Sequence, residues 1–417
     1  MSSKTFDFAI VGSGLPGLIL ASALSRWTSN IALIEGQEQT GGCHKKIATP
    51  LGPLENGLRF FPKTEATEQS LLFLEDVLQL KLIKSTQETN PRTYENGQFK
   101  KFLGFGEQTV DFYEELSYFL SSEEFLLNTP TYDWAQRLLS QFKGQLFTRS
   151  IVTKFVAESE SSQKIKSVTI NGTKTIEAKQ FIFCGTFKDL SVLLPNDYLS
   201  SKAKSKLNKS VYWTAICLDL CHKEKIAEGD AINVLNGTTQ DEIGPCVGRF
   251  FNSAEKPECQ YSQWITFVDE ELSDDSEVAA SALKKMKRQI KRAYPHALEG
   301  LLLERIFVHS NYSGEGIIKL TANQSLPGIE NLWIACGTQN PQKNLISSIS
   351  QAKLVLTSLG YDLADLKSAS TMSQQLNSND VVSDEILPET TPESSSLVLE
   401  EEINTESDLE MATEVTL

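Results

Sequence analysis

The sequence lacks the features that place a chain in a membrane or in an oxidising compartment. No run approaches the roughly 20 apolar residues of a membrane-spanning helix, and the opening MSSKTFDF has no apolar signal core. The seven cysteines form no C-x-x-C pair and no zinc-ligand spacing. We therefore expect a cytoplasmic protein with reduced thiols, no metal site and no transmembrane span. Peripheral membrane contact stays open, and the oligomeric state is not predicted.

Positive charge is also scarce. Lys and Arg number 39 against 54 Asp and Glu, which gives a formal charge of −15. Residues 368–417 contain twelve of the acidic residues and no basic one, so the rest of the chain is nearly neutral. Binding to nucleic acid through a broad basic surface needs clustered positive charge, and this composition argues against it.

The last fifty residues also lack aromatic residues and glycine, while Ser and Thr supply fifteen of the positions in 368–417. Such a segment cannot bury enough apolar surface to offset its chain entropy. We expect a disordered acidic tail that aids solubility, with a docking segment for a basic partner as the alternative.

The sequence does contain a glycine motif in a strand–turn–helix setting. The apolar run Phe6–Val11 is followed by Gly12-x-Gly14-x-x-Gly17 and then by a helical pattern from Leu18. Dinucleotide-binding folds use this arrangement: Gly12 permits the tight turn, Gly14 lets the backbone approach a pyrophosphate, and Gly17 lets the helix pack closely. The amino end of the helix offers unpaired N–H groups to the phosphates.

A second predicted strand, Ile31–Ile34, ends at Glu35. A carboxylate at this position accepts hydrogen bonds from an adenosine ribose and repels a 2′-phosphate. The sequence therefore predicts a dinucleotide that carries no 2′-phosphate. No second G-x-G-x-x-G is present, so a separate NAD(P)H domain is not expected.

With the pair Gly41-Gly42, these residues resemble the extended fingerprint of FAD-binding proteins of the glutathione-reductase structural type. Further stretches resemble the branch that holds amine oxidases, protoporphyrinogen oxidase and phytoene desaturase. The specific ones are Leu51–Gly57, after the glycine pair, and Leu326–Gly337. Looser similarities are the strand Leu146–Val156, the hairpin Asn171-Gly172 and the strand Phe181–Gly185.

The motif and the resemblance together imply a set of FAD-binding residues. They belong to the glycine turn, the end of the second strand, the glycine pair and its successors, a strand beside the adenine, and the last flavin-binding segment. They are Gly12, Ser13, Gly14, Leu15, Pro16, Gly17, Glu35, Gly36, Gly41, Gly42, Cys43, His44, Val152, Gly337, Thr338 and Ser347. Catalytic side chains are not identified, because the cofactor itself accepts the hydride.

Three positions depart from the pattern of the branch. Cys43 stands where an Arg usually follows the glycine pair, and Thr338 stands where an Asp usually holds the ribityl or phosphate region of the flavin. The strand Val211–Leu220 lacks the Lys that amine oxidases often place near flavin N5. FAD binding remains the expectation, whereas amine oxidation is weakened.

The predicted fold class is α/β, with a Rossmann-like FAD-binding domain and an inserted substrate domain of the α+β type. The first domain is expected to contain a mostly parallel sheet with four short buried strands: Phe6–Val11, Ile31–Glu35, Phe181–Cys184 and Leu332–Ala335. It would consist of residues 1–62, 143–189 and 326–362, and the substrate domain of residues 63–142 and 190–325. Apolar residues recur at spacings of three and four within residues 64–142, which predicts a mostly helical segment.

Several residues near the predicted cofactor have two interpretations. His44 either positions the flavin or is a solvated loop residue, and His309 either faces a substrate cavity or lies in the core. Arg59 is a candidate for the pocket wall, together with Phe60 and Phe61 unless these pack in the core.

Two further clusters favour a structural role. In Cys217-x-x-x-Cys221-His222, alternating apolar residues predict a strand with both cysteines packed on one face rather than metal ligands. The basic residues within Lys284–Arg292 predict the solvated face of a helix over Glu277–Ala293, with contact to an anionic lipid or acidic substrate as the alternative.

The favoured function is an FAD-dependent oxidoreductase that transfers a hydride from a small organic substrate to flavin N5, by amine oxidation or C–C desaturation. One alternative is a non-catalytic escort protein resembling Rab GDP-dissociation inhibitors, which keep the architecture but degrade the glycine motif and the acidic residue. Another is a non-redox flavoenzyme such as a sugar-nucleotide mutase. The intact Gly12, Gly14, Gly17 and Glu35 favour a bound nucleotide.

Overall fold

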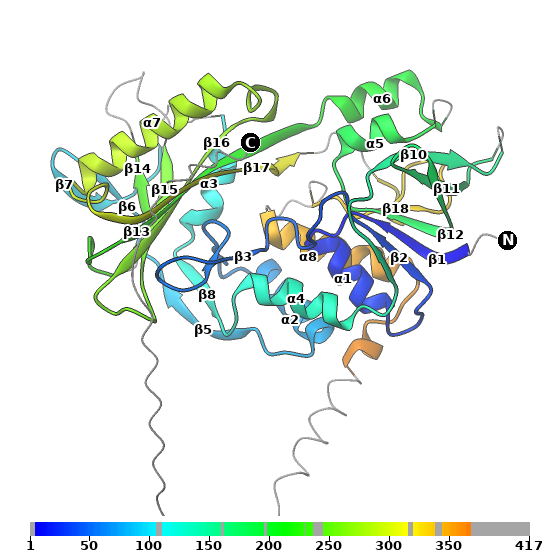
Figure 1. The fold of residues 1–417 in the computed structure, drawn as a ribbon, viewed down its shortest axis with the longest axis horizontal. Coiled ribbons are helices and arrows are strands. Elements are labelled where there is room, and N and C mark those ends of the chain that lie inside the picture. Colours follow the sequence, from blue (N-terminus) through cyan, green and yellow to red (C-terminus); the bar gives the residue numbers. More distant parts are fainter. Residues whose placement is uncertain are drawn as a thin grey trace, which may run out of the picture. The chain divides into compact units, whose positions relative to one another are not determined.

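The computed structural model describes residues 5–105, 111–159, 162–195, 198–229, 231–236, 245–315, 320–337 and 344–367. Its first large sheet has the strand order β10-β11-β12-β1-β2-β9, with β18 also paired to β12 (Figure 1). The strands are β1 (Thr5–Val11), β2 (Ile31–Ile34), β9 (Gln145–Phe147), β10 (Val152–Ala157), β11 (Ile165–Ile170), β12 (Lys174–Phe183) and β18 (Leu332–Ile334).

The four strands predicted for one parallel sheet lie together in this sheet. β1 pairs in parallel with both β2 and β12, and β12 pairs in parallel with β18. Short apolar runs form such strands because both faces of the sheet are covered and no polar face is needed. The predicted α/β class and the parallel sheet are confirmed.

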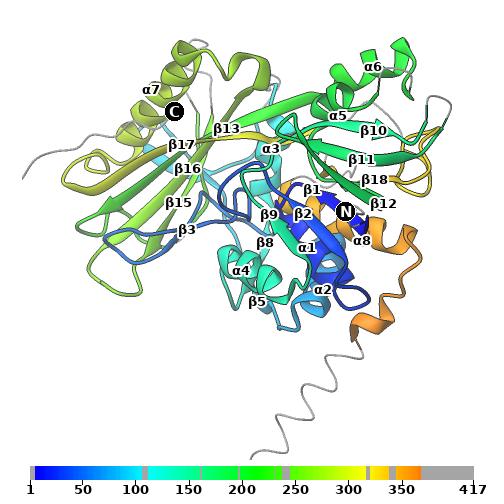
Figure 2. The same ribbon diagram turned by 45° about the vertical axis from the view of Figure 1, so that its right-hand side comes forward.

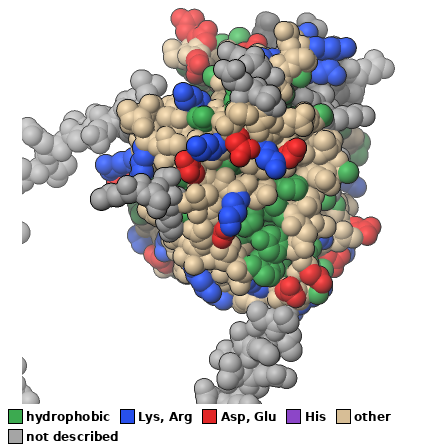
Figure 3. All heavy atoms as spheres, turned by 90° about the vertical axis from the view of Figure 1, so that its right-hand side faces the viewer, with side chains coloured by type: hydrophobic (Ala, Val, Ile, Leu, Met, Phe, Trp, Pro, Cys, Tyr) green, Lys and Arg blue, Asp and Glu red, His purple; other side chains and the backbone are tan. Residues whose placement is uncertain are grey.

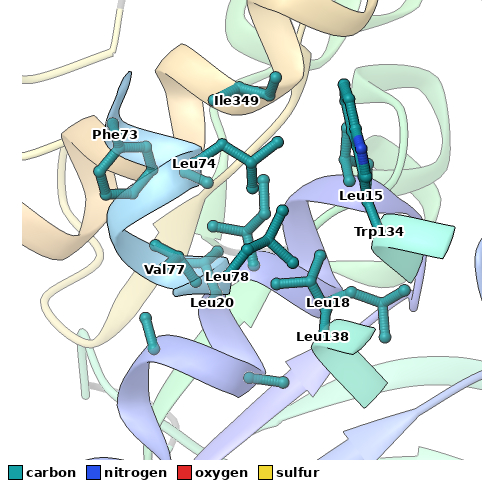
Figure 4. Packing of buried hydrophobic residues seen from close by; sticks show 14 of the residues in the cluster. Leu15, Leu18, Leu20, Phe73, Leu74, Val77, Leu78, Trp134, Leu138 and Ile349 are labelled. Atoms are coloured by element: carbon teal, nitrogen blue, oxygen red, sulfur yellow. The ribbon is translucent and has the colours of Figure 1, made fainter. Parts of the chain in front are cut away.

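Four helices cover one face of the first sheet. They are α1 (Leu15–Leu24), α2 (Glu65–Leu78), α4 (Thr131–Gln141) and α8 (Asn344–Ser358). Leu18 of α1 packs in one buried cluster with Leu74 of α2, Trp134 of α4 and Ile349 of α8 (Figure 4). All ten residues of α1 are buried, so this helix is apolar on every side. Because α2 and α4 belong to this core, part of segment 63–142 packs with the first sheet; the domain boundaries stay a proposal.

The opposite face of the first sheet is covered by an antiparallel extension and two helices. β10 and β11 continue the sheet beyond β12, and α5 (Phe187–Leu193) and α6 (Ser201–Asn208) lie beside them (Figure 1). The predicted turn between β11 and β12 is present, with Asn171 and Gly172 at φ values of 49° and 74°. The stretch predicted as one strand over Leu146–Val156 is divided between β9 and β10, because the chain turns at Arg149, where φ is 50°.

The second large sheet has the order β17-β13-β16-β15-β14-β6-β7. Its strands are β6 (Arg92–Glu95), β7 (Gln98–Lys101), β13 (Val211–His222), β14 (Asn233–Leu235), β15 (Cys246–Asn252), β16 (Gln260–Asp269) and β17 (Leu301–Glu315). α7 (Ser276–Ala293) packs against one face, where Leu218 of β13 lies in a cluster with Met286 and Ile290. Cys217 and Cys221 are buried free thiols on the other face of β13, which confirms their predicted core role.

The prediction that residues 64–142 are mostly helical is wrong in the middle of the segment. Besides α2, α3 (Tyr113–Ser117) and α4, it contains β5 (Ile83–Glu88), β6, β7 and β8 (Glu123–Leu127). β5 pairs with β8, while β6 and β7 extend the second sheet. Long-range pairing therefore decides the structure here, and it overrides the local helical spacing.

A short hairpin follows the glycine pair and forms a separate two-stranded sheet. It consists of β3 (Lys46–Ile47) and β4 (Leu54–Glu55), and the ribbon views show β3 near the second large sheet (Figures 1 and 2). On the face shown in Figure 3, Lys and Arg side chains are interspersed with Asp and Glu. Among the described helices, none is both long enough and apolar enough to cross a membrane.

Candidate functional site

The glycine turn joins the end of β1 to the start of α1. Gly12 has a φ of +98°, a conformation that favours glycine. A Cβ atom on Gly17 would lie 2.0 Å from the carbonyl oxygen of Gly12, so only glycine lets the helix pack this closely. Gly12 and Gly17 are thus required by the fold itself.

Gly14 is different, because the protein around it leaves room for a side chain. Its φ is −61°, and an added Cβ would have Pro16 Cδ at 3.9 Å as its nearest neighbour. The fold therefore does not need glycine at this position. The open space over Gly14 fits a ligand that approaches the backbone closely, as a pyrophosphate does.

The amino end of α1 faces this open space without a cap. Gly14 is the N-cap residue and has no side chain to accept from the first N–H groups, and the first turn contains no acidic residue. Uncapped N–H groups and the positive end of the helix dipole favour an anion at such a helix start.

Glu35 lies at the turn, as its place after β2 predicted. Its Oε2 accepts hydrogen bonds from the backbone N and the hydroxyl of Ser13, at 2.9 and 2.5 Å, and its Oε1 accepts from Gln37 N at 2.8 Å. Carboxylate oxygens can each accept more than one hydrogen bond. Glu35 therefore orders the turn and keeps capacity to accept from a ligand.

The glycine pair packs directly on the turn. Gly41 N donates to the Ser13 carbonyl at 2.9 Å, and a Cβ on Gly42 would lie 3.3 Å from Gly14 Cα. Gly41 and Gly42 have φ values of +101° and +58°. This close approach brings the segment after Gly42 to the open side of the turn.

Two cavities adjoin the turn. The larger, of about 670 Å³, is lined by Gly14, Gly42 and, on β17, by Arg305 and residues 307–314, so it lies between the two large sheets. The smaller, of about 480 Å³, is lined by Gly12, Gly36 and Val152. Both cavities reach Gly185, at the carboxyl end of β12. Ligands of open α/β sheets bind in this region, beyond the carboxyl ends of the strands.

His44 is buried in the wall of the larger cavity, which rules out the interpretation as a solvated loop residue. Its Nδ1 lies 3.0 Å from the Thr131 hydroxyl, which donates to Glu55 Oε2 at 2.8 Å. Because that hydroxyl hydrogen is used, the hydroxyl must accept from Nδ1–H, which leaves Nε2 as the unprotonated nitrogen. Burial, and then the charge of Arg59, lower the pKa of His44 well below its ordinary value, so the ring is neutral.

His309 also lines the larger cavity, from β17. Its Nε2 donates to the Asn56 carbonyl at 3.0 Å, and burial followed by the charge of Arg59 lowers its pKa to about 4. Arg59 lines the same wall and donates through Nη2 to the carbonyl oxygens of Cys43 and Asn56, at 2.8 and 3.1 Å. Phe60 and Phe61 are core residues instead.

The structure brings most of the predicted cofactor-binding residues to the two cavities. Gly14, Leu15, Pro16, Gly42, Cys43, His44 and Gly337 line the larger one, and Gly12, Gly36 and Val152 line the smaller one. Ser13, Gly17, Glu35 and Gly41 form the turn and its supports. Ser347 is buried, and among the described residues its hydroxyl has no hydrogen-bond partner. Thr338 lies outside the described residues.

Sequence reasoning missed Asn56 and Arg305. Arg305 Nη1 donates to Asp219 Oδ2 at 2.8 Å, and its Nη2 donates to Asn56 Oδ1, so both residues shape the cavity wall. A signal for Arg305 was present in its spacing, since Arg305, Phe307 and His309 alternate along β17 and so share a face. Within the described parts of the chain, no group of His, Cys, Asp or Glu is placed to bind a metal ion.

Comparisons with known proteins agree with this architecture. Residues 10–76 match the family model of an NAD(P)-binding Rossmann-like domain. No curated protein sequence matches the chain.

Solved structures match most of the chain. A protoporphyrinogen oxidase candidate from Exiguobacterium sp. 255-15 superposes with a TM-score of 0.63 at 11% identity, over 86% of this chain and 100% of the other. A putrescine oxidase variant with redesigned cofactor binding gives 0.58 at 12% identity, over 86% and 100%. A reduced UDP-galactopyranose mutase gives 0.61 at 11% identity, over 88% and 99%. The chain therefore has the fold that these structures share.

Proposed function

We propose that the chain binds FAD and is an FAD-dependent oxidoreductase acting on a small organic substrate. The observation that carries this proposal is the pair of cavities on either side of the turn, which both reach Gly185. A dinucleotide has two halves joined by a pyrophosphate, and a binding site for it needs two spaces joined at an anion-binding turn.

In this proposal, the smaller cavity takes the adenosine half and the larger one takes the flavin half and the substrate. Gly14 and the start of α1 would hold the pyrophosphate, and Glu35 would accept from the ribose hydroxyls. The space over Gly14, where the nearest atom to an added Cβ would lie 3.9 Å away, supports the fit. When bound, FAD would supply the hydride acceptor at N5.

The residues of the larger cavity would bind and orient the substrate. Neutral His44, held through Thr131, would keep Nε2 available as a proton acceptor at the wall. The substrate would lose a hydride and a proton, with formation of a C=N or C=C bond, and an external acceptor such as oxygen or a quinone would complete the cycle.

The visible absorption spectrum of the purified protein tests this proposal. A flavin spectrum that is bleached by a chemical reductant and recovers in air is expected. A colourless protein that FAD does not reconstitute would contradict it and favour the escort-type alternative. A flavoprotein that isomerises a sugar nucleotide with no net oxidation would support the mutase alternative. The fold of this chain is also similar to that of the UDP-galactopyranose mutase.

A further inference from the structure

The larger cavity has an unbalanced charge. Its lining includes the cations Lys45, Arg59 and Arg305, and among the described residues that line it there is no Asp or Glu. Both histidines of the wall are neutral at physiological pH, as argued above. The surface that meets a bound molecule is therefore positive.

Among the described residues, Arg59 forms a single, long ion pair. Its side chain is 9% exposed, and Glu55 Oε2 lies 4.0 Å from its Nε. Its Nη2 is used by two carbonyl oxygens, and its buried Nε has no hydrogen-bond partner within the described part of the chain. A guanidinium in this state has donor capacity and charge left for a ligand.

Several carboxylates lie behind the wall, and they are already engaged. Glu115 accepts from the Ser313 hydroxyl at 3.1 Å, and Asp189 accepts from the Thr186 hydroxyl at 2.7 Å. Glu55 accepts from the backbone N and the hydroxyl of Thr131, at 2.5 and 2.8 Å. Asp219 accepts from Arg305 at 2.8 Å and from Gln263 at 3.1 Å. Asp219 neutralises the charge of Arg305 by direct contact, whereas Glu55 neutralises the charge of Arg59 only in part, because the two groups are 4.0 Å apart.

Lys45 remains without a carboxylate. It is half-buried, lines the cavity, and forms no ion pair with a described residue, whereas its neighbour Lys46 is exposed and does not line the cavity. Lys45 therefore adds a positive charge to a lining that, among the described residues, contains no Asp or Glu. A cation placed here would meet repulsion at low effective dielectric, and an anion would meet attraction.

We propose that the substrate of this cavity is an organic anion, whose carboxylate or phosphate group is bound by Lys45 and Arg59. This inference rests on the proposed function, because it assigns the substrate class of the same oxidoreductase site. It also distinguishes the chain from an oxidase of diamines, since a dication such as putrescine would face the positive wall.

The test uses the flavin-loaded full chain and three four-carbon probes that differ in charge: succinate, 1,4-butanediol and putrescine. Inorganic phosphate is a fourth probe, which separates phosphate from carboxylate recognition. Each is titrated while the visible flavin spectrum and the melting temperature are recorded. We expect succinate or phosphate to shift the spectrum and raise the melting temperature, and the diol and putrescine to do neither at equal ionic strength.

Variants then assign the effect to the cavity. Lys45→Gln is expected to weaken binding of the anion about tenfold, as for loss of a charge-assisted hydrogen bond, while the matched control Lys46→Gln stays within about twofold of wild type. Arg59→Lys keeps the charge of the buried site and is expected to weaken binding with the fold intact. Both variants should retain flavin.

Three results would overturn the inference and leave the proposed function standing. Putrescine shifts the flavin spectrum at lower concentration than succinate and phosphate; Lys45→Gln and Lys46→Gln have equal effects; or Lys45→Gln loses flavin, which would assign the cation to the cofactor. A chain that binds no flavin at all would instead contradict the proposed function, and this inference with it.

Discussion

The turn around Gly12–Gly17 and the wall formed by β17 are the two sides of one site, and they are built in opposite ways. The turn consists of backbone, and its shape depends on glycines at fixed spacing and on one carboxylate. The wall consists of side chains from distant segments, such as Arg305 bonded to Asn56, which lies 249 residues earlier. A backbone site can hold a part that is common to many ligands, whereas a side-chain wall sets which substrate enters.

The largest expected effect comes from Gly17→Ala. A Cβ at this position would overlap the Gly12 carbonyl oxygen at 2.0 Å, so the helix must move away from the strand. Overpacking of this kind costs about 3 kcal/mol. We expect poor solubility or a clearly lowered melting temperature, measured by circular dichroism, together with loss of flavin. A variant that melts like wild type would show that the close packing is dispensable.

Gly14→Val sharpens the comparison, because it changes the same motif without crowding the protein. The nearest atom to an added Cβ is 3.9 Å away, and the φ of Gly14 is ordinary for any residue. The flavin-free variant is therefore expected to melt within about 2 °C of flavin-free wild type. Overpacking would instead lower the melting temperature by several degrees. Flavin should be lost, because the side chain fills the space proposed for the pyrophosphate. Flavin per chain after gel filtration gives the readout, and Gly14→Ala should have an intermediate value. Full occupancy in Gly14→Val would place the cofactor elsewhere.

Glu35→Ala is expected to have a smaller effect on cofactor binding. Removing a charged acceptor costs about 1.5–3 kcal/mol, which corresponds to roughly ten- to a hundredfold weaker FAD binding. Glu38→Ala is the matched control, because Glu38 is an exposed carboxylate nearby that pairs with Arg149. Ser13→Ala removes the hydroxyl that donates to Glu35. Its effect on FAD affinity shows how much of the loss in Glu35→Ala comes from a less ordered turn. Fluorescence titration with FAD distinguishes these cases, and equal affinities for Glu35→Ala and Glu38→Ala would exclude the ribose role.

The smallest effect concerns the wall, through His309. Its pKa is about 4 in the folded chain against 6.5 when unfolded, so on acidification the unfolded state takes up a proton that the folded state does not. The contribution of neutral His309 to stability is therefore fully present above pH 6.5 and is lost as the pH falls towards 4. Between pH 7 and pH 5, His309 alone should lower the free energy of unfolding by about 2 kcal/mol.

The variant His309→Gln can still donate to the Asn56 carbonyl but does not titrate. We expect urea unfolding to show about 2 kcal/mol less loss of stability between pH 7 and pH 5 than in wild type. The hydrogen bond and ion pair with Glu299 raise the pKa of exposed His296, so His296→Gln should not reduce the loss seen in wild type. An unchanged pH dependence in His309→Gln would mean that the ring is not held neutral in the wall.

The two sides of the site also differ in how far the sequence predicts them. Gly12, Gly17 and Glu35 were identifiable because a local backbone geometry requires particular residues at particular spacings. The parallel strands were equally visible, since burial on both faces leaves uninterrupted apolar runs such as Ile31–Ile34.

The wall could not be predicted in the same way. Asn56 and Arg305 meet only because β17 pairs with β13 and crosses near the β3–β4 hairpin, and no local pattern encodes that meeting. The strands within residues 64–142 were missed for a related reason, because β5 and β8 are stabilised by pairing across 35 residues or more rather than by local spacing. His44 was ambiguous, since its burial depends on Thr131 of α4.

In the proposed function, one dinucleotide occupies both cavities across the turn. The most direct measurement is the identity and amount of the small molecule released when the purified protein is denatured, determined by chromatography and mass spectrometry. We expect FAD at about one molecule per chain, and little of it in Gly14→Val. Release of FMN, release of a phosphorylated nicotinamide dinucleotide, or no nucleotide even after incubation with FAD would show that the two cavities do not hold FAD.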